Sequence, residues 1–171
     1  FAGSVFIGIF EETLFRGYVF GVFRKVLRFW PAAVTASVLF AAIHLVRPVA
    51  PAGLDTTHWA AGFRLFPHAL DGFQMQYFWP TMTNLFLMSL LFCILYNRLG
   101  SIYAAIGLHG GWVWAMGVGN YLFDRNGDRF GALFGPSETV SMTWMGTIVI
   151  AAFLAAALTM PARKAENVGA K

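Results

Sequence analysis

Long runs of apolar residues, separated by short polar breaks, make up most of the chain. Five such stretches lie at about residues 1–23, 31–46, 78–96, 101–123 and 140–160. A helix needs about 20 residues to cross the hydrocarbon core of a bilayer, and only the second stretch is borderline by this measure. Transmembrane β-strands are about 10 residues long and alternate in polarity, which these runs do not. The pattern therefore predicts an all-α fold, a bundle of about five transmembrane helices.

Composition narrows the class of protein further. Hydrophobic residues make up 58% of the chain and charged residues 12%, about half the charged share of a soluble domain, which excludes an ordinary soluble enzyme. The single cysteine, Cys93, excludes a disulfide framework and a zinc ribbon. The net charge of +4 is not gathered into a basic patch large enough to neutralise phosphates, so no nucleic-acid partner is expected. The expected partner is the lipid bilayer.

The chain shows no internal repeat and no low-complexity run, so residues 1–171 are expected to form a single domain. It begins with Phe1 rather than Met and enters an apolar run at once, which favours the C-terminal part of a longer chain. The aromatic-rich segment from Arg47 to about Tyr77 is expected to lie on the membrane surface or to fold over a cavity. The expected location is an integral, multi-pass position in a bacterial inner (plasma) membrane.

Three charged residues lie near the middle of the first stretch, where they are costly. Each ionised group among Glu11, Glu12 and Arg16 costs about 2.5–3.5 kcal/mol at the centre of a membrane helix. Glu12 and Arg16 are spaced i, i+4 and can pair on one face of the helix. Glu11 lies about 100° further round and needs a partner on another helix, a proton or a hydrated cavity. The alternative is a buried ion pair that only fixes helix packing, but this leaves Glu11 unexplained.

Two histidines lie at a similar depth on other predicted helices. Glu11 precedes the charged turn at Arg24 by 13 residues, and His44 follows Pro31 by 13, so both lie roughly 20 Å from the same face. His109 lies roughly 12 Å inside the fourth stretch by the same rise per residue. Antiparallel neighbouring helices would therefore bring these side chains to comparable levels.

Two glutamates and two histidines at similar depth are suited to hydrolysis. A buried carboxylate can take a proton from water, and imidazoles can hold that water or donate to an oxyanion. His44, His109 and Glu11 could also bind a divalent metal such as zinc, because metal hydrolases use similar ligands with one open position. The spacing is not HExxH, so the sequence leaves both a metal site and a metal-free site open.

These residues carry a resemblance to a known family. The chain resembles the CPBP family of intramembrane endopeptidases, the group of type II CAAX prenyl proteases and bacteriocin-processing (Abi) proteins. That family has the motifs EExxxR, FxxxH and HxxxN in this order. The matching residues here are Glu11-Glu12-x-x-x-Arg16, Phe40-x-x-x-His44 and His109.

The resemblance implies an endopeptidase that cleaves a peptide or protein substrate near the membrane surface. Glu11 would activate water and His44 would help to place it. Glu12 and Arg16 would organise the site, and His109 would face the scissile carbonyl. Both a metal-dependent and a glutamate-only mechanism are compatible with the family.

One position departs from the family pattern. Val113 stands where the family has the Asn that helps to hold the substrate carbonyl or oxyanion. Losing one such donor can cost about 10²–10³ in rate. The departure leaves room for a specialised or weakened protease. Two other classes of function also stay open: a non-catalytic membrane immunity or scaffold protein, and a proton-coupled transporter that uses buried Glu and His.

Overall fold

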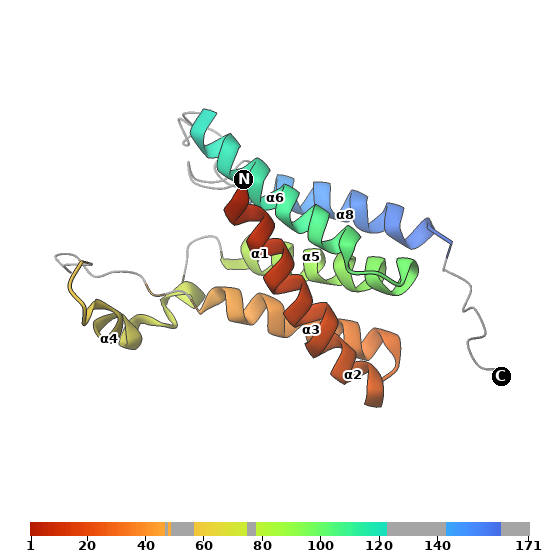
Figure 1. Cartoon of the computed structure of the whole chain (residues 1–171), viewed down its shortest axis with the longest axis horizontal. Helices are drawn as coiled ribbons and strands as arrows, with labels where there is room; N and C mark the ends of the chain where they lie inside the picture. The colour runs from red at the N-terminus through yellow and green to blue at the C-terminus, as the bar shows by residue number, and fades with distance from the viewer. Residues whose placement is uncertain (47, 49–56, 75–77, 123–142, 162–171) are drawn as a thin grey trace.

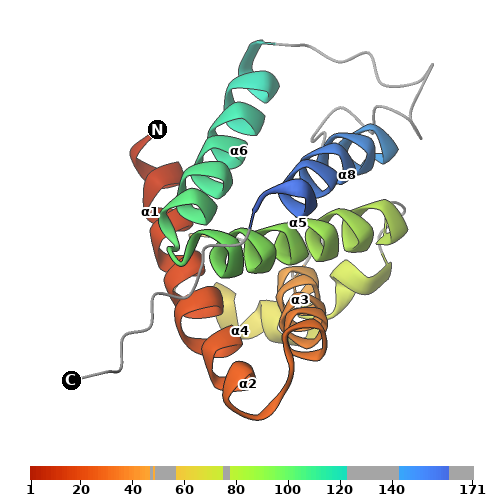
Figure 2. The same cartoon turned by 90° about the vertical axis from the view of Figure 1, so that its right-hand side faces the viewer.

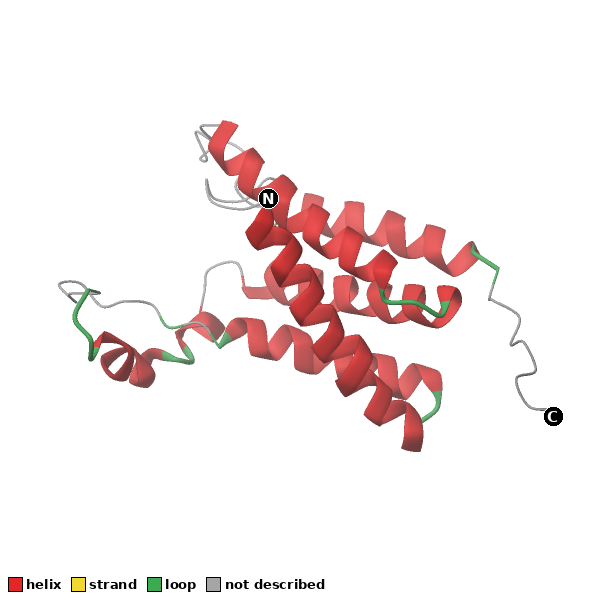
Figure 3. Cartoon of the chain, in the orientation of Figure 1, coloured by secondary structure: helices red, strands yellow, loops and turns green. Residues whose placement is uncertain are grey.

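The regular elements of the described chain are all helical. The computed structural model describes residues 1–46, 48, 57–74, 78–122 and 143–161. The helices are α1 (Ala2–Glu12), η1 (Thr13–Phe20), α2 (Gly21–Val26), α3 (Phe29–Leu45), α4 (Ala61–Leu65), η2 (Phe66–His68), η3 (Asp71–Gln74), α5 (Phe78–Leu99), α6 (Tyr103–Leu122) and α8 (Trp144–Thr159). No strand occurs in these ranges, which confirms the predicted all-α fold (Figure 3).

Each predicted apolar stretch contains a helix, with small differences at the ends. α3 begins at Phe29 rather than at Pro31, because a proline is tolerated within the first turn and does not have to begin it. α5 continues past Tyr96 to Leu99, and Gly100 then ends it with φ 65°. Only glycine adopts this left-handed conformation without cost, and the Gly100 amide donates to the Tyr96 carbonyl at 2.9 Å.

The first stretch forms one path of three consecutive helical segments, α1, η1 and α2. The middle segment, η1, is a π-helix of eight residues. π-helical turns are rare and often occur at functional sites. Glu12 is the last residue of α1 and Arg16 lies in η1, so the predicted pair spans the change from α- to π-helix.

Helix α5 lies at the centre of the bundle. It packs against α3 and against α8, while α1 packs mainly on α6 (Figures 1 and 2). Figure 2 shows α8 and α3 on opposite sides of α5. The main apolar core is built on buried α5 side chains, among them Met88, Leu91, Phe92, Ile94 and Leu95.

Within the described residues, α5 is the one helix that is both long and apolar enough to cross a membrane. α3 and α8 are apolar but shorter, with 17 and 16 residues. The predicted number of about five membrane spans therefore stays a prediction.

Polar side chains join α5 to the beginning of α8. The Asn84 amide nitrogen donates to the Thr143 carbonyl at 2.9 Å, and the Thr147 hydroxyl donates to the Asn84 side-chain oxygen. The Thr143 hydroxyl accepts from the Gly146 amide at 3.1 Å, so Thr143 is the N-cap of α8. At the other end of α8, Arg98 donates to the carbonyls of Leu158 and Met160.

Residues 57–74 form a short arm beside the bundle (Figure 1). It contains α4, η2 and η3, and η3 contacts α3 and α5. The side chains of Trp59, Phe63 and Phe66 are 84%, 77% and 79% exposed. The predicted position of this segment, on the membrane surface or over a cavity, stays a prediction.

Candidate active site

Helix α1 presents its two consecutive carboxylates in different directions. Glu12 is fully buried, whereas Glu11 keeps 24% of its side chain exposed. This follows from the turn of about 100° between neighbouring residues of a helix. Glu12 faces the interior of the bundle, and Glu11 stands at its accessible edge.

Arg16 holds Glu12 from within the same helical path. One guanidinium nitrogen lies 3.0 Å from Glu12 Oε1, and another donates to the Ser89 carbonyl on α5 at 3.1 Å. The rings of Phe40 and Phe92 both have centroids 4.9 Å from the guanidinium carbon. Arg16 is fully buried, so its charge is compensated by a carboxylate, a carbonyl and two ring faces. The predicted i, i+4 pair is present.

His109 connects the two carboxylates from α6. Its Nδ1 lies 2.8 Å from Glu12 Oε1, and its Nε2 lies 3.8 Å from Glu11 Oε2. Because Glu12 is paired with Arg16 as a carboxylate, it accepts, and His109 donates through Nδ1. The imidazole is 4% exposed and stacks on Phe92, with 5.4 Å between ring centroids. Its position and tautomer are therefore fixed from two sides.

His44 reaches Glu11 from the end of α3. Its Nε2 lies 3.2 Å from Glu11 Oε2, and its Nδ1 lies 2.8 Å from the Phe40 carbonyl oxygen. A carbonyl can only accept, so Nδ1 carries a proton. Nε2 presents a lone pair to Glu11 when the ring is neutral and donates to Glu11 when the ring is protonated. The side chain is 29% exposed, so the Glu11–His44 edge is the accessible side of the network.

The structure thus brings all four candidate catalytic residues into one network. It runs from His44 through Glu11 and His109 to Glu12, and Arg16 closes its buried end. Phe40 belongs to it through its ring and its carbonyl. Val113 lies one helical turn after His109 on α6, half-buried.

Two contacts of the network were not anticipated from the sequence. Phe92 is one apolar residue among many in α5, so nothing in the pattern distinguishes it. Ser89 contributes its backbone carbonyl, which no side-chain pattern reveals. The sequence showed which residues needed partners, but α5 supplies two partners that are chemically ordinary.

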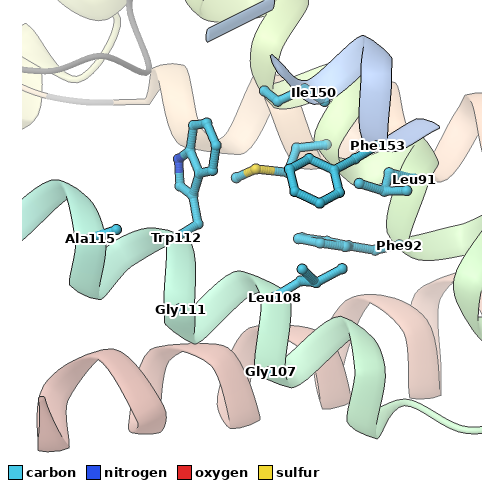
Figure 4. A pocket seen from close by; sticks show the side chains of 10 residues that line it. Leu91, Phe92, Gly107, Leu108, Gly111, Trp112, Ala115, Ile150 and Phe153 are labelled. Carbon is cyan, nitrogen blue, oxygen red and sulfur yellow. The ribbon is translucent and has the colours of Figure 1, made fainter. Parts of the chain in front are cut away.

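Two apolar cavities adjoin α6. One of about 250 Å³ lies between α5, α6 and α8, and Phe92, Trp112 and Phe153 are among its lining residues (Figure 4). Another of about 240 Å³ lies between the start of α1 and α6. Neither is lined by the four candidate catalytic residues, so the prediction that these residues share one hydrated cavity stays a prediction. Phe92 links the first cavity to the network, because it also stacks on His109.

The fit of a metal can be examined from the donor atoms. Among the described residues, no three His, Cys, Asp or Glu side chains are grouped as a metal site requires. His44 Nδ1 is already occupied by the Phe40 carbonyl and His109 Nδ1 by Glu12. A metal-bound histidine commonly makes such a contact with its other ring nitrogen, and Nε2 of both rings faces Glu11 here. A divalent metal held by Glu11, His44 and His109 therefore stays a prediction.

Comparison with known proteins agrees with the motifs. No curated protein and no solved structure matches the chain. One family model, described as type II CAAX prenyl endopeptidase Rce1-like, matches residues 1–115, which include the EExxxR and FxxxH motifs and His109. The match covers more than half of the 171 residues. The chain therefore belongs to the Rce1-like family of type II CAAX prenyl endopeptidases, a membrane-embedded family.

Proposed function

We propose that this protein is an intramembrane endopeptidase that hydrolyses a peptide bond near the membrane surface with water activated by Glu11. One observation carries the proposal: His44 Nε2 and His109 Nε2 both face Glu11 Oε2, at 3.2 and 3.8 Å. Three hydrogen-bond acceptors converge there without a donor when both rings are neutral. A water molecule that donates to Glu11 and to His44 would satisfy two of them and leave a lone pair free to attack.

In the proposed reaction, that water attacks the scissile carbonyl carbon while Glu11 takes one of its protons. The carbon–nitrogen bond then breaks, and the proton passes to the leaving amine. The products are a carboxylic acid and an amine, so the atoms of one water and one peptide bond are accounted for. On its way to the amine, the proton that Glu11 takes from water can pass to His109 Nε2, which lies 3.8 Å from Glu11 Oε2. His109 then donates through Nδ1 to Glu12 and through Nε2 to the developing oxyanion, until Nε2 gives this proton to the leaving amine.

Glu12 and Arg16 have a supporting role in this mechanism. The Glu12 carboxylate holds Nδ1–H of His109 and so fixes which ring nitrogen faces Glu11. Arg16 compensates the charge of the Glu12 carboxylate through the 3.0 Å contact between them. The network is thus a base, two imidazoles and a buried ion pair that orients one of them.

The membrane topology belongs to the proposal as well. We propose that α1–α2, α3, α5, α6 and α8 all cross the bilayer of a bacterial inner (plasma) membrane. The 22 residues of α5 rise roughly 33 Å and the 17 of α3 roughly 25 Å, against about 30 Å of hydrocarbon. His44 is next to last in α3, which would place the accessible edge of the site near a membrane face.

The test is cleavage of a membrane-anchored reporter peptide by purified protein in vesicles. Glu11→Gln keeps the volume of the side chain but cannot accept a proton, so we expect the rate to fall by about 10²–10⁴. Asp71→Asn is the matched control, because it makes the same chemical change at the His68 contact outside the network. Prenylated and unprenylated peptides, each with and without a chelator, separate substrate class and metal dependence. An unchanged rate for Glu11→Gln would eliminate this residue as the base and shift attention to Glu12.

A non-catalytic scaffold is the second candidate, and Val113 is the observation that favours it. The family Asn at this position would supply an oxyanion donor, and valine supplies none. A screen of peptides in which the wild type cleaves nothing would support the scaffold.

A further inference from the structure

Two glycines mark the closest approach of α1 and α6. A Cβ added to Gly8 would lie 2.9 Å from the Ile106 carbonyl oxygen and 3.1 Å from the Gly110 amide nitrogen. A Cβ added to Gly110 would lie 3.1 Å from the Ser4 carbonyl oxygen. Real Cβ atoms essentially never approach closer than 3.0 Å, and every obstructing atom here is backbone. A side chain at Gly8 is therefore incompatible with this separation of the helices, and one at Gly110 would have to move the Ser4 carbonyl by a few tenths of an ångström.

The contact lies beside the catalytic network. Gly8 precedes Glu11 by three residues and Glu12 by four, so on α1 it lies between the directions in which the two carboxylates point. Gly110 follows His109 directly on α6. Both glycines are buried, and the α1–α6 pair holds the distances from Glu12 to Nδ1 and from Glu11 to Nε2 of His109.

We propose that Gly8 and Gly110 are positioning residues, which set the separation of α1 and α6 so that both carboxylates reach the two ring nitrogens of one histidine. This inference rests on the proposed function only for its effect on rate. A methyl group at Gly8 has to move the Ile106 carbonyl by about half an ångström to reach ordinary contact. That shift would lengthen the 2.8 Å hydrogen bond between Glu12 and His109.

The chain offers a matched control on each helix. Gly3 on α1 and Gly107 on α6 have nothing within 4 Å of where a Cβ would stand. Alanine favours a helix more than glycine does, so Gly3→Ala and Gly107→Ala should leave the protein as stable as before or more stable. Gly8→Ala and Gly110→Ala gain the same preference, and only the close contact distinguishes them from the controls.

The experiment measures three properties of these four variants in vesicles. Folding is measured by the protection of Cys93, the one cysteine of the chain, from a thiol reagent. The ring-nitrogen and Nδ1–H resonances of ¹⁵N-labelled His109, assigned by their loss in His109→Gln, report the hydrogen bond to Glu12. Peptide cleavage gives kcat and KM separately.

We expect Gly8→Ala and Gly110→Ala to fold, to lose or shift the His109 resonances, and to lower kcat by about 10²-fold with KM nearly unchanged. The controls should keep the resonances and kcat. Unchanged His109 resonances in Gly8→Ala would overturn the proposal, whatever happens to the rate. Failure of both variants to fold, while the controls fold, would also overturn it, because the contact would then serve assembly rather than positioning. If the wild type cleaves nothing, the resonances still decide this proposal while the proposed function fails.

Discussion

Removing Arg16 should lower the free energy of unfolding more than most single substitutions do, and the structure gives the size of this loss. Arg16→Met keeps a long side chain between Phe40 and Phe92 but leaves the carboxylate of Glu12 buried and without its cation. Breaking a buried ion pair in this way costs about 3–5 kcal/mol. Each desolvated cation–π contact can add from about 0.5 to 2 kcal/mol.

The expected loss is therefore at least about 3 kcal/mol. Since 1.4 kcal/mol is a factor of ten, the unfolding equilibrium constant should rise more than a hundredfold. Total stabilities are about 5–15 kcal/mol, so the variant should keep only part of its folded population under mild denaturation. His109 should be affected too, because the Glu12 that orients it has lost its own partner.

Cys93 provides the assay. It is the only cysteine, 1% exposed on α5, so a thiol-reactive dye labels the chain only when α5 opens. Labelling is followed against temperature and denaturant in detergent and in vesicles. The control is the double variant Glu12→Gln/Arg16→Met, which removes both charges and should recover part of the lost stability.

Two results would refute this reasoning. One is an Arg16→Met protein within about 1 kcal/mol of the wild type, well below the cost of a stranded buried charge. The other is a double variant that is no more stable than Arg16→Met. Either result would mean that water or rearranged side chains compensate the charge of Glu12 in the variant. The Glu12–Arg16 pair would then contribute little to the stability of the protein.

Three further changes address other parts of the molecule. Val113→Asn restores an amide one turn beyond His109 and should raise kcat, by up to about 10²-fold; an unchanged kcat in peptide cleavage would show that this position does not face the substrate. Asn84→Leu removes the hydrogen bonds to Thr143 and Thr147 and should destabilise the docking of α8 by about 1–2 kcal/mol, seen as faster hydrogen exchange in α8 but not in α3. Arg98→Gln should free the last turn of α8 for exchange while leaving cleavage intact, and equal exchange in both proteins would contradict that capping role.

The sequence could predict the helices, because they follow from a repeat along one axis, and it could predict that polar residues of different helices lie at comparable levels along the bundle. The predicted stretch 78–96 lies within α5, and 101–123 covers α6 to within two residues at each end. The pairing of Glu12 with Arg16 could be predicted because it lies within one helical path. In the same way, the cost of a buried charge predicted that Glu11 needs a partner on another helix, a proton or a hydrated cavity. His44 and His109 supply the first of these.

What could not be predicted concerns the rotation and separation of helices. The depth argument predicts the height of His109 along the bundle. It does not predict that both of its ring nitrogens face carboxylates. Nor does any residue pattern here distinguish the close contact at Gly8 from a glycine that faces open space, such as Gly3. These properties depend on atoms brought together from distant parts of the chain, which no local pattern contains.

The π-helix also has a consequence for how the first helical path tolerates changes in length. With i→i+5 bonding, each turn of η1 takes up about one residue more than a turn of α-helix. The path before it faces α6, while η1 contacts α3 and α5. Deleting one residue from η1 would rotate everything after the deletion by about 80° relative to Glu11 and Glu12. The direction in which the Phe20 side chain points is therefore set by the number of residues in η1. Because Phe20 packs against α3, deleting one residue from η1 would be as disruptive as a core substitution.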